Sequence, residues 1–334
     1  MTGAGERAYA YAKACGVVGK SFLGAARGRL ASVNRPAELD RLIFPDAPLD
    51  LPEQQLSARL ERRIADRAAS RIVGIVSSFS HPAAALVRLV RSYEYADLKA
   101  ALASLAAGER KPPLHVDLGP FGTVAWDAYP NLKAMLASTE FDWLRETPTE
   151  ATVMDAQTSL DLHFYRSLWR EILELPKGDR RGFEELVAEE IELKNVVWAL
   201  RLRSYYGQSG EEIEPKLADI ARRGRSLAAE ARRALTFAAD RREDWRGWKF
   251  EALLNPESPG EFWKLDPRYV QNAAARNLSR RSRLLFHRRP FASDSIACFI
   301  KLMQYEEDLL TSVAEGLTLG LGAKETLALL EVNA

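Results

Sequence analysis

Residues 56–64, Leu-Ser-Ala-Arg-Leu-Glu-Arg-Arg-Ile, decide the fold class of this chain. Leu56, Leu60 and Ile64 recur every four positions, which places all three on one face of an α-helix. A broader apolar stripe of the same kind runs from Leu186 to Leu200. Alanine, leucine, arginine and glutamate, which favour helices, dominate most of the remaining sequence. The sequence therefore predicts an all-α fold.

Strand signals are weak by comparison. Residues 114–126 alternate loosely between polar and apolar, and Gly119-Pro120-Phe121-Gly122 would close a short hairpin. Pro112 and Pro113 stand directly before this stretch and favour a linker instead.

An internal repeat organises the chain. Three short acidic segments, at residues 38–42, 140–144 and 242–246, are each expected to form a short helix. They contain Asp40, Asp142 and Asp244, which are 102 residues apart each time. A long amphipathic helix is expected after each segment, at 56–78, 159–173 and 266–286. A second long helix follows each time and carries one glutamate of the set Glu94, Glu192 and Glu306.

These repeats predict three similar helical units, at residues 1–110, 111–212 and 213–334, in one compact body. Units of about 100 residues are larger than solenoid repeats, so we expect three of them to close around an axis instead of stacking in a rod. The three recurring glutamates are candidates for the lining of a central socket. The alternative is that they cap or brace neighbouring helices.

Composition excludes several classes of protein. The 334 residues are 47% hydrophobic and 28% charged, which is typical of a globular protein. The net charge is +1, from 47 basic and 46 acidic residues, so nothing draws the whole chain to nucleic acid or to an anionic surface. The longest uncharged stretch, residues 72–87, is shorter than a membrane span needs.

The two cysteines, Cys15 and Cys298, cannot form a disulfide framework or a four-ligand zinc site. They fit a reduced, cytoplasmic setting as small core residues. The first ten residues include Glu6 and Arg7 and lack the apolar core of a signal peptide.

Gly19-Lys20-Ser21 imitates the end of a phosphate-binding loop. That motif also needs a glycine where Ala14 stands and a buried strand before it, whereas residues 7–13 have a helical pattern. We interpret the segment as a helical turn. The four histidines are scattered, and no nucleophile elbow occurs. We therefore expect no catalytic residue, no cofactor and no metal.

The strongest local asymmetry is a basic run without acidic residues between positions 268 and 290. Its members include Arg280, Arg281 and Arg283, which we take as candidate partner contacts. Such a run suits an acidic protein face or lipid headgroups, a solvated helix face, or nucleic acid.

Several motifs together resemble the C subunit of the V-type and A-type ATPases and ATP synthases, which is called d in the eukaryotic pump. The stretch His287-Arg288-Arg289-Pro290-Phe291, followed by an acidic helix at 306–310, is similar to that family's C-terminal Pro-Phe turn and helix. Residues 92–99, 190–201 and 160–165 agree in order and spacing.

The resemblance implies a funnel of three similar helical units around a pseudo-threefold axis. It also implies a non-catalytic central-stalk subunit, peripheral on the cytoplasmic face of the membrane. Its partners would be the D and F subunits of the central shaft on one side and the membrane proteolipid ring on the other. Two other classes remain as alternatives: a nucleotide-binding enzyme that uses Gly19-Lys20-Ser21, and a basic helical nucleic-acid adaptor. The sequence does not distinguish a proton from a sodium machine, or a pump from a synthase.

Overall fold

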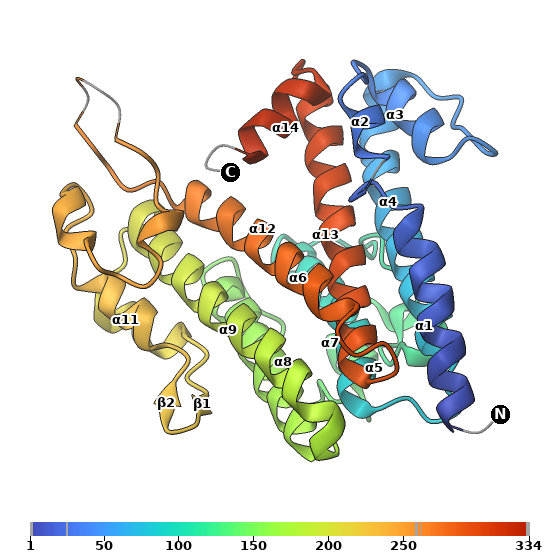
Figure 1. Cartoon of the computed structure of the whole chain (residues 1–334), viewed down its shortest axis with the longest axis horizontal. Helices are drawn as coiled ribbons and strands as arrows, with labels where there is room; N and C mark the ends of the chain where they lie inside the picture. Colours follow the sequence, from blue (N-terminus) through green and yellow to red (C-terminus); the bar gives the residue numbers. More distant parts are fainter. Residues whose placement is uncertain (1–2, 25, 258–259, 261, 332–334) are drawn as a thin grey trace.

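The structure is a computed structural model that describes residues 3–24, 26–257, 260 and 262–331. Helices dominate these residues, and the all-α prediction is confirmed. The strands of the described ranges are two residues long each: β1 (Ala221–Arg222) pairs antiparallel with β2 (Arg225–Ser226). Figure 1 shows this hairpin at the end of the molecule opposite α1 (Gly3–Gly19).

Three groups of helices, called hairpins below, form the body of the molecule. Their helices are α4 (Glu53–Val76) with α5 (Ala84–Val90) and α6 (Ser92–Ala106), α8 (Val153–Glu174) with α9 (Lys177–Tyr206), and α12 (Pro267–Phe286) with α13 (Ser293–Thr318). The leading helices α4, α8 and α12 coincide closely with the predicted ranges 56–78, 159–173 and 266–286. Apolar periodicity is therefore a sufficient guide to the long helices.

Shorter elements connect and cover the hairpins. They are α2 (Arg27–Leu30), α3 (Pro36–Ile43), α7 (Leu132–Leu136), α10 (Gly210–Ile213), α11 (Ala229–Leu235) and α14 (Ala323–Glu331), with the 3₁₀ turns η1 (Gly119–Phe121), η2 (Trp126–Ala128), η3 (Glu214–Lys216), η4 (Arg242–Trp245) and η5 (Glu251–Leu253). Local chemistry sets some boundaries. α3 begins with Pro36, whose ring suits the first helical turn, and α9 ends at Gly207 with a φ of 63°.

The helices pack in chain order and then close on themselves. α4 packs on α5, α5 and α6 on α8, α8 on α9, α9 on α12, and α12 on α13. α13 then packs along α4, so the last long helix returns to the first. α13 also contacts α1, α5 and α9, which makes it the most widely shared element of the body.

The hydrophobic core consists of two clusters. The larger unites residues from Ala10 to Leu327, and the smaller lies between Leu193 and Ala274. α9 and α12 belong to both clusters: the N-terminal half of α9 and the C-terminal end of α12 join the larger one, and their other halves join the smaller one. The boundaries of these clusters do not coincide with those of the three predicted units. We therefore keep as predictions the division at 110 and 212, the threefold axis and the funnel.

The three equally spaced aspartates have different surroundings. Asp40 is buried in α3 and accepts hydrogen bonds from Arg63 and the Leu49 amide, at 2.5 and 2.6 Å. Asp142 lies in an exposed turn, and Asp244 lies in η4 and accepts a bond from the Ala238 amide. The expected short helix at 140–144 is wrong, because this segment forms turns.

The segment after the first hairpin is a linker, as Pro112 and Pro113 indicate. Residues 111–131 run irregularly through η1 and η2, and no strand occurs in that range. Among the helices that the structure describes, none has both the length and the apolar composition that a membrane crossing requires.

Gly182 allows α9 to approach the beginning of α13. A Cβ atom built at this buried glycine would lie 1.8 Å from Oδ2 of Asp294. Asp294 is itself 2% exposed and is held by Arg289 at 2.6 Å, so it has no free space to retreat into.

We expect Gly182→Ala to destabilise the fold by about 1–3 kcal/mol, as overpacking of a close helix contact does. Gly178→Ala, one turn earlier on α9, is the matched control, because nothing lies within 4 Å of its built Cβ. Urea unfolding followed by circular dichroism measures both. Equal stability of the two variants would contradict the close approach.

Candidate functional site

A hollow of about 270 Å³ lies between α9, α12 and α13. Each helix presents one stripe to it, because the lining residues recur every three or four positions. The stripes are Glu190, Leu193, Lys194, Val197, Trp198 and Arg201 on α9, Gln271, Ala274, Ala275, Leu278, Ser279 and Ser282 on α12, and Lys301, Gln304, Tyr305 and Asp308 on α13.

A second recess of about 220 Å³ adjoins the hollow at Trp198 and Arg201, which line both. Its other lining residues come mainly from α6, α8 and the C-terminal half of α9. The concave surface therefore draws on five of the long helices. A larger depression of about 690 Å³ lies over α8 and the loops around α10, but it carries no aromatic side chain.

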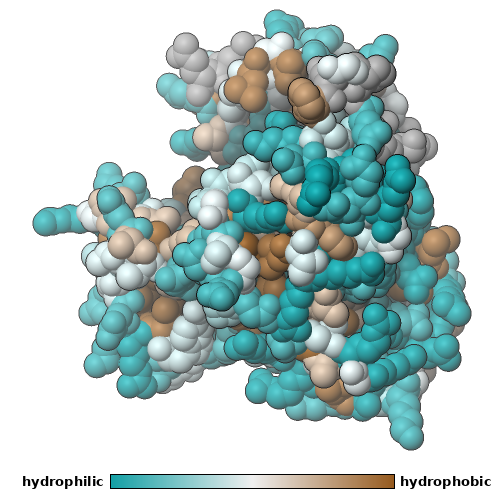
Figure 2. Space-filling model, turned by 90° about the vertical axis from the view of Figure 1, so that its left-hand side faces the viewer, coloured by the Kyte–Doolittle hydropathy of each residue, from teal (hydrophilic) through white to brown (hydrophobic). Residues whose placement is uncertain are grey.

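Figure 2 shows the end of the molecule that carries α11 and the β1–β2 hairpin. Hydrophilic residues cover most of this face, and hydrophobic ones show mainly in recesses and in a small group at the top. Outside the grey residues, no broad apolar face is visible at this end. The recessed surfaces are therefore the better candidates for a specific contact.

Polar groups in the hollow are only partly satisfied by this chain. Lys301 Nζ donates to Glu190 Oε1 at 2.8 Å, and the Tyr165 hydroxyl donates to the same oxygen at 3.1 Å. Glu190 Oε2 and Ser282 Oγ are buried without a hydrogen-bond partner in the described ranges. A buried polar atom left unpaired costs about 1–3 kcal/mol.

Two charged side chains at the opening of the hollow also have no close ion-pair partner. Lys194 and Asp308 are exposed, and neither is fixed by a close ion pair within the described ranges. Desolvation by the surrounding protein raises the pKa of Asp308, while Lys194 and Lys301 act in the opposite direction.

The hollow combines apolar and charged side chains, as protein interfaces do. Trp198, Tyr305 and Leu278 offer apolar area beside the charges, as in the core of a protein interface. The hollow contains no histidine or cysteine. In the part of the chain that the structure describes, no three His, Cys, Asp or Glu side chains are placed to hold a metal ion.

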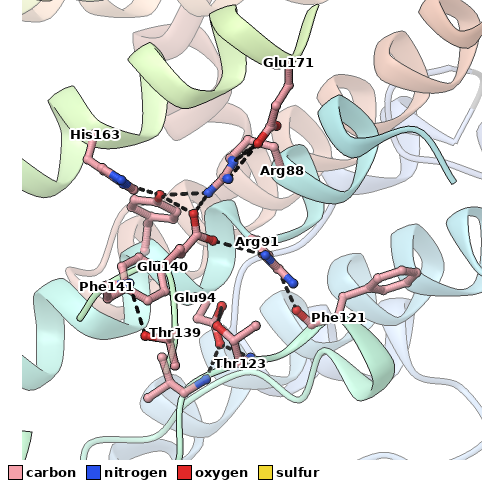
Figure 3. A network of polar contacts seen from close by, with 12 residues as sticks. Arg88, Arg91, Glu94, Phe121, Thr123, Thr139, Glu140, Phe141, His163 and Glu171 are labelled. Atoms are coloured by element: carbon pink, nitrogen blue, oxygen red, sulfur yellow. Dashed lines mark hydrogen bonds and ion pairs between the residues drawn. The ribbon is translucent and has the colours of Figure 1, made fainter. Parts of the chain in front are cut away.

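Glu94, the first of the three predicted glutamates, lies on α6 and is 2% exposed. Its carboxylate accepts hydrogen bonds from the amide and hydroxyl of Thr123 and from the amide of Val124, at 2.5, 2.9 and 2.7 Å (Figure 3). It fastens the irregular segment after α6 to its helix.

Glu306 lies on α13 and is equally buried. It accepts the Phe22 amide at 2.8 Å and pairs with Arg71 at 2.9 Å and Arg67 at 3.5 Å, both on α4. Glu192 on α9 instead pairs with Lys249 at 2.5 Å near the surface. Glu94 and Glu306 thus brace this chain, and contact of the three glutamates with a partner remains a prediction.

The residues three positions after Glu94 and Glu192 show a closer likeness. Asp97 accepts the Val116 amide at 2.7 Å, and Asn195 Oδ1 accepts the Ala218 amide at 2.8 Å. Both side chains therefore hold the segment that follows their helix. The sequence aligns these two positions but does not reveal this shared role.

Much of the basic run is used inside the chain. Arg281 pairs with Glu185 and Glu189 of α9 at 3.2 and 3.6 Å, and Arg283 donates to the Leu23 carbonyl at 2.5 Å. Arg280 is exposed. Of the three candidate arginines, two therefore bind their own chain, and contact with a partner remains a prediction.

The Gly19-Lys20-Ser21 segment is the end of a helix. α1 extends through Gly19, and the Ser21 hydroxyl donates to the Val18 carbonyl at 2.7 Å. Since no strand precedes it among the described residues, the helical-turn interpretation is confirmed.

A buried polar network between the first two hairpins was not predicted (Figure 3). Arg88 of α5 binds Glu171 of α8 at 2.7 Å and also pairs with Glu140. The Tyr95 hydroxyl contacts Glu140 at 3.2 Å and His163 Nδ1 at 2.7 Å. Because Arg88 and Glu171 are 83 positions apart, no local pattern identifies them as partners.

Comparison with known proteins agrees with this architecture. The sequence matches the ATP synthase (C/AC39) subunit family over residues 48–328, a range that includes all three hairpins. The chain belongs to this family. It is also 27% identical over 314 residues to a Treponema pallidum (strain Nichols) protein described as uncharacterized, a match that covers 92% of this chain and 91% of that protein.

Membership confirms the resemblance to the C subunit of the V/A-type ATPases. Membership also implies a place in the ATPase complex.

We expect Glu94→Ala to cost about 2–4 kcal/mol of unfolding free energy, because it leaves buried donors without an acceptor. Glu192→Ala removes only a pair near the surface and should cost less than about 1 kcal/mol. Denaturant unfolding of both variants measures the difference. A loss for Glu192→Ala as large as that for Glu94→Ala would contradict the bracing role.

The buried carboxyl group of Glu307 makes the stability of the fold depend on pH. Burial raises its pKa to about 8, with Asp308, Asp97 and Asp66 nearby adding to the effect. The folded chain then keeps a proton that the unfolded chain loses above about pH 4.5, so this contribution to stability falls as pH rises towards 8. Burial also raises the pKa of Asp97, to about 6.

Glu307→Gln should therefore flatten the loss of thermal stability between about pH 6 and pH 8. Glutamine keeps an acceptor for the Tyr93 hydroxyl, which donates to Glu307 at 2.5 Å. Unfolding midpoints across this range measure the slope. Identical slopes in the wild type and the variant would refute the coupling.

Proposed function

We propose that this chain is a non-catalytic central-stalk subunit of a rotary V/A-type ATPase. In this role it seats the rotating shaft, made by the D and F subunits, on the membrane proteolipid ring. It lies at the cytoplasmic face and transmits torque without an activity of its own. Membership in the C/AC39 family supports the assignment to the complex.

The hollow between α9, α12 and α13 is the observation that carries the seating role. It has aromatic and aliphatic side chains and charges without a close ion pair in the described ranges, and its walls are regular helices. A helical shaft foot would cover the apolar area and pair with the charges at the opening. Three similar helical units around an axis would offer such a foot several similar walls.

Torque transmission requires that a force applied in the hollow reach the opposite side of the subunit. The closed packing order from α4 to α13 and back to α4 supports this part of the proposal. Buried ion pairs such as that of Glu306 with Arg71 add directional contacts between helices that are distant in sequence.

The alternatives receive no comparable support. A nucleotide-binding enzyme would need a phosphate loop where α1 ends, and residues up to Gly19 are helical. A nucleic-acid adaptor would need a free basic face, whereas Arg281, Arg283 and Arg289 bind groups of their own chain.

The test is co-purification of the tagged chain from cells that produce the complete ATPase. Ala275→Trp places an indole in the hollow and should sharply reduce recovery of the shaft subunits, because the bulky ring occupies the seat. Ala58→Trp, at an exposed position of α4, is the matched control and should retain them. Circular dichroism of the purified chains verifies that both variants fold.

Recovery of shaft and ring subunits with the wild type, and loss of the shaft alone with Ala275→Trp, would support the proposal. Wild-type chain that recovers neither would refute the stalk role. Normal shaft recovery with a folded Ala275→Trp variant would exclude the hollow as the seat.

A further inference from the structure

A separate pocket of about 370 Å³ lies on α8, against the turn at Trp143. Its lining consists of Trp143, Ser159, Leu162, His163, Arg166, Ser167 and Arg170. The α8 members recur every three or four positions and form one stripe. This pocket shares no lining residue with the hollow.

The pocket carries positive charge, and no carboxylate lines it. Arg166 also lines the larger depression, which holds Glu211, Glu214 and Asp219, but neither Arg166 nor Arg170 makes a hydrogen bond or close ion pair with any residue that the structure describes. Asp219 interacts electrostatically with Arg166, but its carboxylate pairs with Arg232 at 2.9 Å. The two pocket arginines stand four positions apart on α8, where like charges destabilise a helix by a few tenths of a kcal/mol. Both side chains are exposed and therefore accessible to a partner.

The floor of the pocket offers a buried donor. Ser167 is 6% exposed, and its hydroxyl has no hydrogen-bond partner in the described ranges. His163 is half-buried, and its Nδ1 contacts the Tyr95 hydroxyl at 2.7 Å, which leaves Nε2 for an occupant (Figure 3). Two guanidinium groups, a hydroxyl and an imidazole together match an oxyanion.

The wall of the pocket is aromatic. Trp143 is 42% exposed, and its ring centroid lies 5.4 Å from that of His163. An exposed tryptophan beside unpaired arginines is typical of a protein contact, where both residue types are enriched. A free inorganic anion would leave this apolar area unused, whereas a peptide with an acidic and an apolar side chain would cover both.

We propose that this pocket, the Trp143–Arg170 pocket, binds an acidic peptide segment of a protein partner. A carboxylate of that segment lies between Arg166 and Arg170, and a neighbouring apolar side chain packs on Trp143. The site is independent of the shaft seat, so it gives the subunit a second protein contact.

His163 reports occupancy of the pocket. Burial lowers the pKa of its imidazole, and Arg88, Arg170 and Arg166 lower it further. The charged and titratable groups around it are Tyr95, Arg88, Glu140, Glu171, Arg166 and Arg170. A bound carboxylate offsets the arginines and raises the pKa of His163, so binding should tighten as pH falls through that pKa.

The experiment titrates the full chain with an acetylated peptide of two aspartates, one glutamate, one phenylalanine and one leucine. The same peptide with amides in place of the acids is the control ligand, and sodium phosphate is a third probe. The variants are Arg166→Gln with Arg170→Gln, and Trp143→Ala. Arg41→Gln with Arg59→Gln, both exposed in the first hairpin region, makes the same change in net charge elsewhere.

We expect the acidic peptide to bind the wild type and the Arg41/Arg59 variant alike, and the Arg166/Arg170 variant at least about tenfold more weakly. Trp143→Ala should also weaken binding, and the pKa of His163, followed by NMR, should rise on addition of the peptide to the wild type. Equal binding of the acidic and amide peptides, equal binding to the two arginine variants, or no binding at millimolar peptide would overturn the proposal. Phosphate binding that the peptide does not displace would overturn it as well, because it would assign the pocket to a free anion.

Discussion

The carboxylate of Glu306 joins three segments that are far apart in the chain. One oxygen accepts the Phe22 amide just after α1, and the other pairs with Arg71 on α4, while Glu306 itself belongs to α13. Most contacts between long helices link neighbours in the packing order, whereas the contact of α13 with α4 closes that order on itself. A buried ion pair adds little net stability compared with apolar packing, yet its geometry admits few alternative registers. The position of α13 against α4, and with it the walls of the hollow, depends on that register.

The sequence predicts the long helices well and the sites poorly, for different physical reasons. Helix periodicity is local, so residues such as Leu56 and Leu60 indicate their shared face without knowledge of the rest of the fold. The role of Glu94 depends on amides at Thr123 and Val124, about thirty positions away, and that of Arg88 on Glu171, 83 positions away. Such pairs are set by tertiary packing. The equal spacing of Asp40, Asp142 and Asp244 likewise does not predict equal structure, because Glu140 beside Asp142 is drawn into the buried network.

Charge is used in two ways in this subunit. Glu94, Glu306 and the Arg88 network satisfy their charges within the chain, and they fix how segments meet. Lys194, Asp308, Arg166 and Arg170 instead line two separate concave surfaces without a close ion pair in the described ranges. Net charge near zero hides this difference, since basic and acidic residues balance over the whole chain. In this member of the C/AC39 family, the charges that indicate candidate contact surfaces are those without a close ion pair in the folded chain.

The sharing of α9 and α12 between the two hydrophobic clusters has a mechanical consequence. α9 has 30 residues and is therefore about 45 Å long, and α12 packs along it. Neither helix is interrupted where one cluster gives way to the other, so the clusters are joined by continuous hydrogen-bonded rods instead of flexible loops. Bending one cluster relative to the other requires bending both rods together. Under load the two clusters would therefore respond together, as one stiff beam.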